Sequence, residues 1–155
     1  MANKLFDTPD TTRQFDPQDI ELNNRLSLLS YLGVLVLVPL FCVKYSRYAR
    51  YHANQGLVLF LVNLASGIVL SAIKLVLGLI ATGVSALFVQ VASSSGAAFL
   101  MTVGSVLAGA FNVFVWILSI AVSVALLFLT VVGILYAVKG RAKELPLIGR
   151  IHLLK

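Results

Sequence analysis

Two runs of polar residues hold the side chains that could do chemistry in this sequence. The first run, residues 47–56, combines two arginines, one histidine and two carboxamides: Arg47, Arg50, His52, Asn54 and Gln55. At the start of a helix, these cations and the free backbone N–H groups would suit an anion or a peptide carbonyl. The alternative, which we favour, is structural: His52 and Asn54 cap the helix, and Gln55 bonds a neighbouring helix.

The second run, residues 139–150, is basic and leads into apolar residues. Its charged side chains before Pro146 are Lys139, Arg141, Lys143 and Glu144. Basic anchors beside a short apolar strip are typical of a segment on a membrane surface, where anionic lipid headgroups supply the counter-charge.

Enzymatic constellations are nearly missing. His52 and His152 are the only histidines, Glu144 is the only acid after Glu21, and Cys42 has no obvious base. The sequence has no phosphate loop, metalloprotease motif or nucleotide-binding glycine pattern. A metal cluster of His52, Glu144 and His152 is conceivable, but ligands spaced so widely are far more often coincidence. We therefore expect no catalytic residue, no metal site and no cofactor.

The residues between these two runs have the composition of a membrane protein. Of the 155 residues, 59% are hydrophobic and 12% are charged, whereas about 25% are charged in soluble domains. Lys74 is the only Lys, Arg, Asp or Glu between His52 and Lys139. A soluble domain could not keep a hydrated surface with this pattern. The net charge of +6 lies beside apolar segments, so it indicates membrane topology and lipid contacts rather than nucleic acid.

The fold class predicted is an all-α integral membrane helical bundle. Residues 1–15 are too polar to order themselves and are expected to be disordered. Asp16 as N-cap, Pro17 at the first helical position and Asp19 in the first turn predict an amphipathic helix over residues 16–25. The rest forms a single membrane domain, residues 26–155, with spans at residues 26–43, 53–80 and 111–138.

Residues 84–108 are predicted to form a broken apolar hairpin between the second and third spans. Its halves, about 84–92 and 98–108, would be joined by Ser93–Gly96, and each is too short to span. The alternative is that residues 75–110 add two further crossings. In either arrangement Lys74 is expected to mark the outer interface by snorkelling.

Positive charge orients these spans. Lys44, Arg47 and Arg50 follow the first span, and residues 139–155 carry five Lys and Arg. Both segments are therefore predicted to be cytoplasmic, with the N-terminus outside a bacterial plasma membrane. The two polar runs would then share an inner face and could form one patch. Small residues at helical spacing make a homo-oligomer possible, although we favour packing within the chain as their use.

Several segments resemble a known family. The residues that carry the resemblance are Asp19–Asn24, Leu28–Gly33, Pro39-Leu40, Arg50–Leu57, Lys139-Gly140 and Glu144–Gly149. They are similar to a bacterial family of small membrane proteins of unknown function, which is distantly similar to the chloroplast inner-envelope protein-import subunit. The match covers about residues 19–70 and 130–152. It implies three helical spans with a basic loop after the first, and no settled activity, and the Gly- and Ser-rich insertion departs from it.

The leading hypothesis is a non-enzymatic partner-binding or scaffold protein that uses the inner-face patch of residues 47–55 and 139–150 to bind a membrane-protein partner. A transporter or translocation-associated component is the alternative. Its support is the distant resemblance and the broken hairpin.

Overall fold

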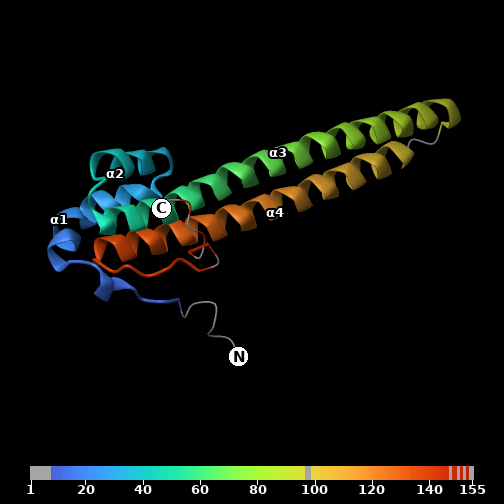
Figure 1. The fold of residues 1–155 in the computed structure, drawn as a ribbon. Coiled ribbons are helices and arrows are strands. Elements are labelled where there is room, and N and C mark those ends of the chain that lie inside the picture. Colours follow the sequence, from blue (N-terminus) through green and yellow to red (C-terminus); the bar gives the residue numbers. More distant parts are fainter. Residues whose placement is uncertain (1–7, 97–98, 147, 150, 152, 154–155) are drawn as a thin grey trace. The chain divides into compact units, whose positions relative to one another are not determined.

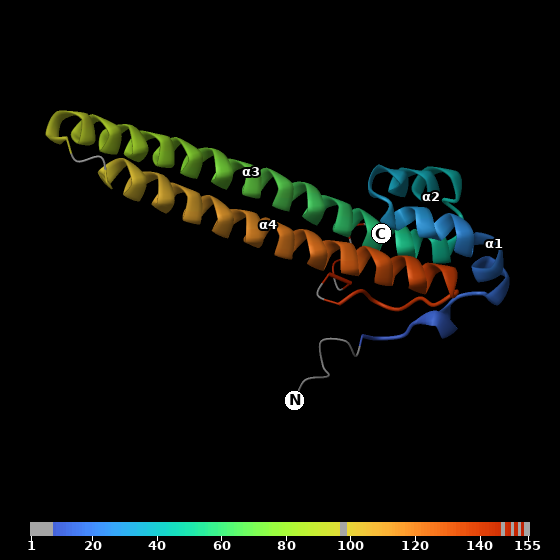
Figure 2. The same cartoon turned by 180° about the vertical axis from the view of Figure 1, so that it is seen from behind.

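The computed structural model is all-α, which confirms the predicted fold class (Figures 1 and 2). It describes residues 8–96, 99–146, 148–149, 151 and 153. The α-helices are α1 (Pro17–Ser27), α2 (Leu37–Cys42), α3 (Arg47–Ser95) and α4 (Phe99–Val138). Short 3₁₀ helices cover Thr12–Gln14, Leu28–Tyr31 and Gly33–Val36. The described residues form two compact units, the first from those within 1–64 and 125–155 and the second from those within 65–124.

Helix α1 begins where the local signals place it. The Asp16 side chain accepts a hydrogen bond from the Gln18 N–H (2.9 Å), and Pro17 occupies the first helical position. An N-cap carboxylate satisfies one of the free N–H groups of the first turn, and proline loses no hydrogen bond there. The predicted helix over residues 16–25 is therefore present and runs two residues further, to Ser27.

The predicted first span, residues 26–43, is not one helix. Two 3₁₀ turns and the six-residue α2 divide it, and Gly33, the first residue of the second turn, has a positive φ of 61°. A left-handed residue ends a right-handed helix, so no segment here reaches the length of a crossing. The described chain has two helices, not three, that are long and apolar enough to cross a membrane.

The prediction that residues 84–108 form a separate hairpin is also wrong. Helix α3 begins at Arg47 rather than near Ala53 and continues past Ile80 to Ser95, while α4 starts at Phe99. The hairpin halves are therefore the ends of the two long helices, which lie side by side in the second unit (Figures 1 and 2). A mid-helix glycine costs only about 1 kcal/mol, too little to end an apolar helix. The turn itself falls close to its predicted place, because Gly96 has a φ of 69°.

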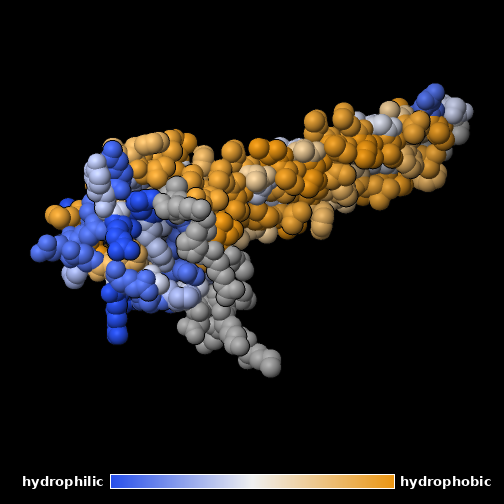
Figure 3. Space-filling view, in the orientation of Figure 1, coloured by the Kyte–Doolittle hydropathy of each residue, from blue (hydrophilic) through white to orange (hydrophobic). Residues whose placement is uncertain are grey.

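Both long helices expose their apolar side chains. In the most apolar 18-residue stretch, only 17% of α3 and 11% of α4 is buried, whereas the core helix of a soluble protein is mostly buried. Apolar residues cover the visible face of the second unit, and polar residues gather on that of the first (Figure 3). With 49 and 40 residues, each helix exceeds the about 20 that one crossing requires.

The N-terminal segment contacts the chain that follows α4. The Thr11 N–H donates to the Ala142 carbonyl (2.9 Å), and the Glu144 N–H donates to the Pro9 carbonyl (3.3 Å). Residues 1–7 lie outside the described residues, but residues 9–12 are thus held in place, although composition predicts disorder over 1–15. The partner residues that order them lie about 130 positions away in sequence. No bilayer can separate two segments that are hydrogen-bonded to each other.

Candidate functional site

The site is built on the first three turns of α3. Ser46 caps the helix, because its Oγ accepts from the Ala49 N–H (3.0 Å). Asp19 of α1 adds a second acceptor, its Oδ2 lying 3.1 Å from the Tyr48 nitrogen. The expectation that His52 and Asn54 cap the helix is therefore wrong, since both lie inside it. Local sequence could not show a cap that comes from a different helix.

The position of Asp19 beside the start of α3 lowers the pKa of its carboxyl. Partial burial alone would raise the pKa of its carboxyl, but hydrogen bonds from the Ser46 side chain, the Tyr48 N–H and the Asn23 side chain outweigh burial and lower the pKa. The carboxylate also lies at the positive end of the α3 dipole. The pKa of Asp10 is lowered as well, mainly by hydrogen bonds from the Thr12 hydroxyl and N–H.

An aromatic cluster surrounds His52. The imidazole is completely buried, its ring centroid is 4.6 Å from that of Tyr48, and its Nδ1 is 2.9 Å from the Tyr31 hydroxyl. The Tyr48 hydroxyl donates to the Ala137 carbonyl of α4 (3.0 Å). The Tyr31 ring packs against Gly133, where an added Cβ would be only 2.4 Å from the ring. This cluster joins the 3₁₀ turn at Leu28–Tyr31 to both α3 and α4.

The two carboxamides of the first run bind the main chain of residues 141–153, which we call the C-terminal strap. Gln55 Oε1 accepts from the Leu145 N–H (3.2 Å), and Gln55 Nε2 donates to the Lys143 carbonyl (3.5 Å). Asn54 Oδ1 accepts from the Leu153 N–H (2.6 Å), and its Nδ2 donates to the Ile151 carbonyl (2.9 Å). Each carboxamide therefore pairs with the C=O of one strap residue and the N–H of the residue two positions later.

The structure brings the two predicted runs together, but not as one exposed patch. Three of the nine candidate residues are buried: His52, Asn54 and Gln55. Four are exposed: Arg47, Arg50, Lys139 and Arg141. Lys143 and Glu144 are intermediate. The buried residues hold the two runs together, and the arginines and Lys139 lie on the surface.

Metal binding finds no support in the described part of the chain, where no three His, Cys, Asp or Glu side chains form a group that could hold an ion. His152, one member of the cluster considered from sequence, lies outside the described residues. Cys42 is exposed, so it is not part of the buried cluster.

Sequence inspection missed the residues that complete the site. Tyr31 and Leu145 are both almost fully buried there, and the Thr11 and Thr12 hydroxyls form hydrogen bonds with the main chain of Ala142 in the strap. A signal did exist for Tyr31, because a phenol inside an apolar segment needs a hydrogen-bond partner when it is buried. No local signal marked the two threonines.

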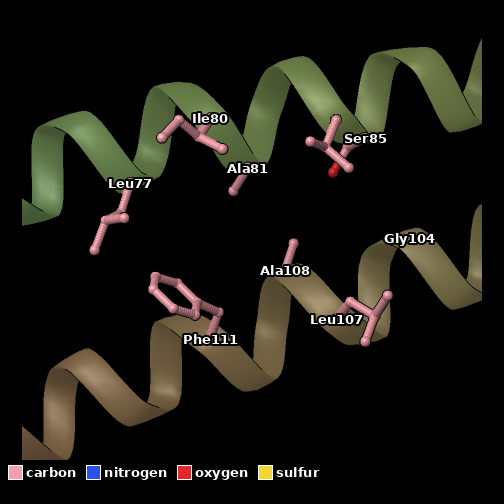
Figure 4. Close-up of a pocket in the computed structure, with 9 residues that line it drawn as sticks. Leu77, Ile80, Ala81, Ser85, Gly104, Leu107, Ala108 and Phe111 are labelled. Atoms are coloured by element: carbon pink, nitrogen blue, oxygen red, sulfur yellow. The ribbon is translucent and has the colours of Figure 1, made fainter.

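A separate apolar cleft lies between α3 and α4 in the second unit (Figure 4). It has a volume of about 260 Å³, and Ser85 is its only side chain with a hydroxyl or charge. Its lining is Leu77, Ile80, Ala81, Val84, Ser85, Gly104, Leu107, Ala108 and Phe111. Such a lining can accommodate hydrocarbon but contains no group that could act on it.

Fold and site together define an all-α protein with two helices long and apolar enough to cross a membrane, joined at one end by a buried polar cluster. Comparison of the chain with protein-family models, curated proteins and solved structures gave no match. The resemblance noted from sequence therefore stays a prediction.

Proposed function

We propose that this protein is a non-enzymatic membrane scaffold that binds a partner at the membrane surface through the cations of its two polar runs. The observation that carries the proposal is the Gln55 contact with Lys143 and Leu145, because it ties the two runs into one packed unit. Arg47, Arg50 and Arg141 are exposed on that unit. Charged groups on a rigid support favour specific association, since little ordering is needed on binding.

A bacterial plasma membrane is the setting that we propose, with the C-terminal strap cytoplasmic as the positive charge of residues 139–155 indicates. We also propose that the N-terminus is cytoplasmic, in place of the outside location expected from three spans. Two crossings return the chain to its starting side, and the Thr11 contact with Ala142 supports this arrangement.

Cysteine labelling tests this orientation. In a Cys42→Ser background, Arg13→Cys and Lys139→Cys each place a thiol at an exposed position. We expect both thiols to react with an impermeant maleimide in inverted vesicles and neither to react in intact spheroplasts. Labelling from opposite sides would rule out the two-crossing topology.

Photo-crosslinking in cells tests partner binding. Tyr45 is 89% exposed beside the first run, so a benzoyl-phenylalanine placed there samples a bound partner. We expect discrete adducts that disappear when Arg47, Arg50 and Arg141 are all changed to Gln. Arg25→Gln, an exposed charge on α1, is the matched control and should leave the adducts unchanged. Adducts that are equally strong in the triple variant would contradict a cation-dependent partner site.

The transport or translocation alternative keeps only its distant family resemblance, which we retain as a proposal. The broken hairpin that also supported it is absent, because α3 and α4 are continuous over residues 84–95 and 99–108. Proteoliposome flux no faster than that of protein-free liposomes would reject it.

A further inference from the structure

A groove separate from the apolar cleft lies in the first unit, where α4 ends. It has a volume of about 670 Å³, and its walls come from the segment before α1, from α1 and from the end of α4. Arg13, Glu21 and Lys139 line the groove, and all three residues are exposed. None of the three forms an ion pair with another residue that the structure describes. Two positive charges and one negative charge are therefore available to a ligand.

Contacts within the chain hold the walls of this groove in place. The Phe15 ring packs edge-on against the Tyr51 ring, with 5.4 Å between the ring centroids. Gly140 has a φ of 66°, and a Cβ added there would be only 2.8 Å from the Ile20 side chain, so the chain after α4 lies directly against α1. Because the walls are preformed, little ordering is needed when a ligand binds.

An apolar stripe on α4 begins at this groove. Val138 lines the groove and is 51% exposed. Leu135, Val131 and Leu127 follow at helical spacing on the same face, and they are 46%, 46% and 62% exposed. The helix rises by about 16 Å from Leu127 to Val138, which is half of a hydrocarbon layer about 30 Å thick. The stripe therefore has the length of one lipid leaflet, and the charged groove lies at one end of it.

This arrangement matches a phospholipid in both charge and polarity. Cations beside the cytoplasmic end of a crossing helix are typical of sites for lipid headgroups, where they face phosphate. Glu21 distinguishes between headgroups, because a carboxylate repels a headgroup that is only anionic and attracts one that also carries an ammonium group. The N–H groups of a primary ammonium donate charge-assisted hydrogen bonds to a carboxylate.

We infer that the groove binds a phospholipid whose headgroup carries a phosphate and a primary ammonium. The phosphate lies beside Arg13 and Lys139, the ammonium lies beside Glu21, and one acyl chain covers the apolar stripe. An acidic peptide is not the occupant, because it would leave the stripe uncovered. The inference goes beyond the proposed partner function, whose test uses arginines outside the groove. The proposed orientation assigns this lipid to the cytoplasmic leaflet.

Native mass spectrometry of the delipidated full chain in mild detergent tests the inference, because each bound lipid adds its own mass. The probes are phosphatidylethanolamine, which carries both headgroup charges, and phosphatidylglycerol with the same acyl chains, which lacks the ammonium. We expect phosphatidylethanolamine to bind at least about threefold more tightly, as one exposed ion pair allows. The net charge of +6 favours phosphatidylglycerol, so this preference cannot come from non-specific attraction. Equal affinity, or tighter binding of phosphatidylglycerol, would overturn the site.

Variants and a soluble competitor assign the parts of the lipid. Arg13→Gln combined with Lys139→Gln should weaken the binding of both lipids by about tenfold, and Glu21→Gln should remove the preference for phosphatidylethanolamine. Arg25→Gln is the matched control and should change neither, because Arg25 is an exposed cation of α1 that is not among the described residues of the lining. Free phosphoethanolamine in about hundredfold excess should not displace the lipid, since it has no acyl chain to bury. A preference that survives Glu21→Gln would contradict the role of the acid, and displacement by phosphoethanolamine would assign the groove to a soluble phosphate instead.

Fluorescence quenching in nanodiscs tests the acyl chain with the groove unaltered. Trp116→Phe removes the only tryptophan, and Leu135→Trp then places a reporter on the stripe at a position that is already exposed. In a phosphatidylcholine bilayer, a small fraction of phosphatidylethanolamine brominated in its acyl chains should quench this reporter more than the same fraction of brominated phosphatidylcholine. A reporter at Leu118→Trp, an exposed position outside the stripe, should be quenched equally by the two lipids. Equal quenching at the stripe as well would show ordinary contact with the bilayer only and would overturn the inference.

Discussion

Gly56→Ala tests the packing that supports the site, because the backbone of the 3₁₀ turn at Leu28–Tyr31 lies directly against Gly56 of α3. A Cβ added there would lie 1.9 Å from the Ser30 carbonyl oxygen and 2.5 Å from its carbonyl carbon. Carbon and oxygen atoms need about 3.3 Å, so the turn or the helix must move by more than 1 Å, on the order of one atomic radius. Ser30 is fully buried, and its clashing atoms are backbone that no rotamer change can remove.

The expected cost follows from opposing effects. Overpacking of this kind costs about 1–3 kcal/mol, and displacing the turn also threatens the hydrogen bond between Tyr31 and His52, worth about 1 kcal/mol. The higher helix propensity of alanine stabilises the variant by about 1 kcal/mol and offsets part of this cost. The last two effects cancel, so we expect Gly56→Ala to lower the free energy of unfolding by about 1–3 kcal/mol.

Gly78→Ala is the matched control in the same helix. No heavy atom lies within 4 Å of the added Cβ, so only the propensity gain of about 0.5–1 kcal/mol remains. Unfolding by sodium dodecyl sulfate from mild detergent micelles, followed by circular dichroism, measures both variants. If Gly56→Ala stays within about 0.5 kcal/mol of the natural chain, or shifts stability in the same direction as Gly78→Ala, the close approach described here is refuted.

Three further predictions concern residues that contact the first turns of α3 or the strap. Gln55→Ala leaves the Leu145 N–H without its acceptor and should cost about 1–3 kcal/mol in the same unfolding assay; an unchanged midpoint would show that water replaces the carboxamide. Leu145→Ala should cost about 2–5 kcal/mol and speed tryptic cleavage after Lys143, and unaltered cleavage would mean that the leucine does not anchor the strap. Hydrogen bonds lower the pKa of Asp19 below its ordinary value of 3.8. The ionised side chain therefore contributes its full stabilisation of the fold above that pH, and the contribution is lost as pH falls through the lower folded pKa. Asp19→Asn should flatten this acid-side loss, and a pH profile that matches that of the natural chain would assign the loss to other groups.

The elements set by local signals were predictable from sequence, and those set by distant contacts were not. Asp16 and Pro17 predict the start of α1 because capping needs only neighbouring residues. The apolar composition of residues 26–43 predicts a span, yet composition carries no information on where the backbone turns left-handed. Gly33 decides that, and the contact of Ser30 with Gly56 holds the turn in place.

The candidate site was predictable in its residues but not in its partners. Asn54 and Gln55 stand out because carboxamides near the end of an apolar helix must find hydrogen bonds. The atoms that they bind lie 88 to 99 positions further along the chain, and nothing local indicates a backbone contact over that separation. Sequence left two roles open for these residues, a structural role and the binding of a peptide carbonyl. Both descriptions apply within the chain, since Asn54 and Gln55 bind peptide groups of the same chain.

The segment between α1 and α3 contains no helix long enough to cross a membrane. Its apolar side chains are nevertheless exposed, with Val34 at 62% and Phe41 at 70%, and water is a poor environment for such side chains. Irregular backbone is tolerated at membrane depth only where protein or a water-filled cavity covers it. Residues 28–42 therefore suit the interfacial layer, with apolar side chains toward lipid tails and carbonyl groups within reach of water. In that position the turn at Ser30 would brace α3 where it enters the membrane, beside the carboxamides that bind the strap.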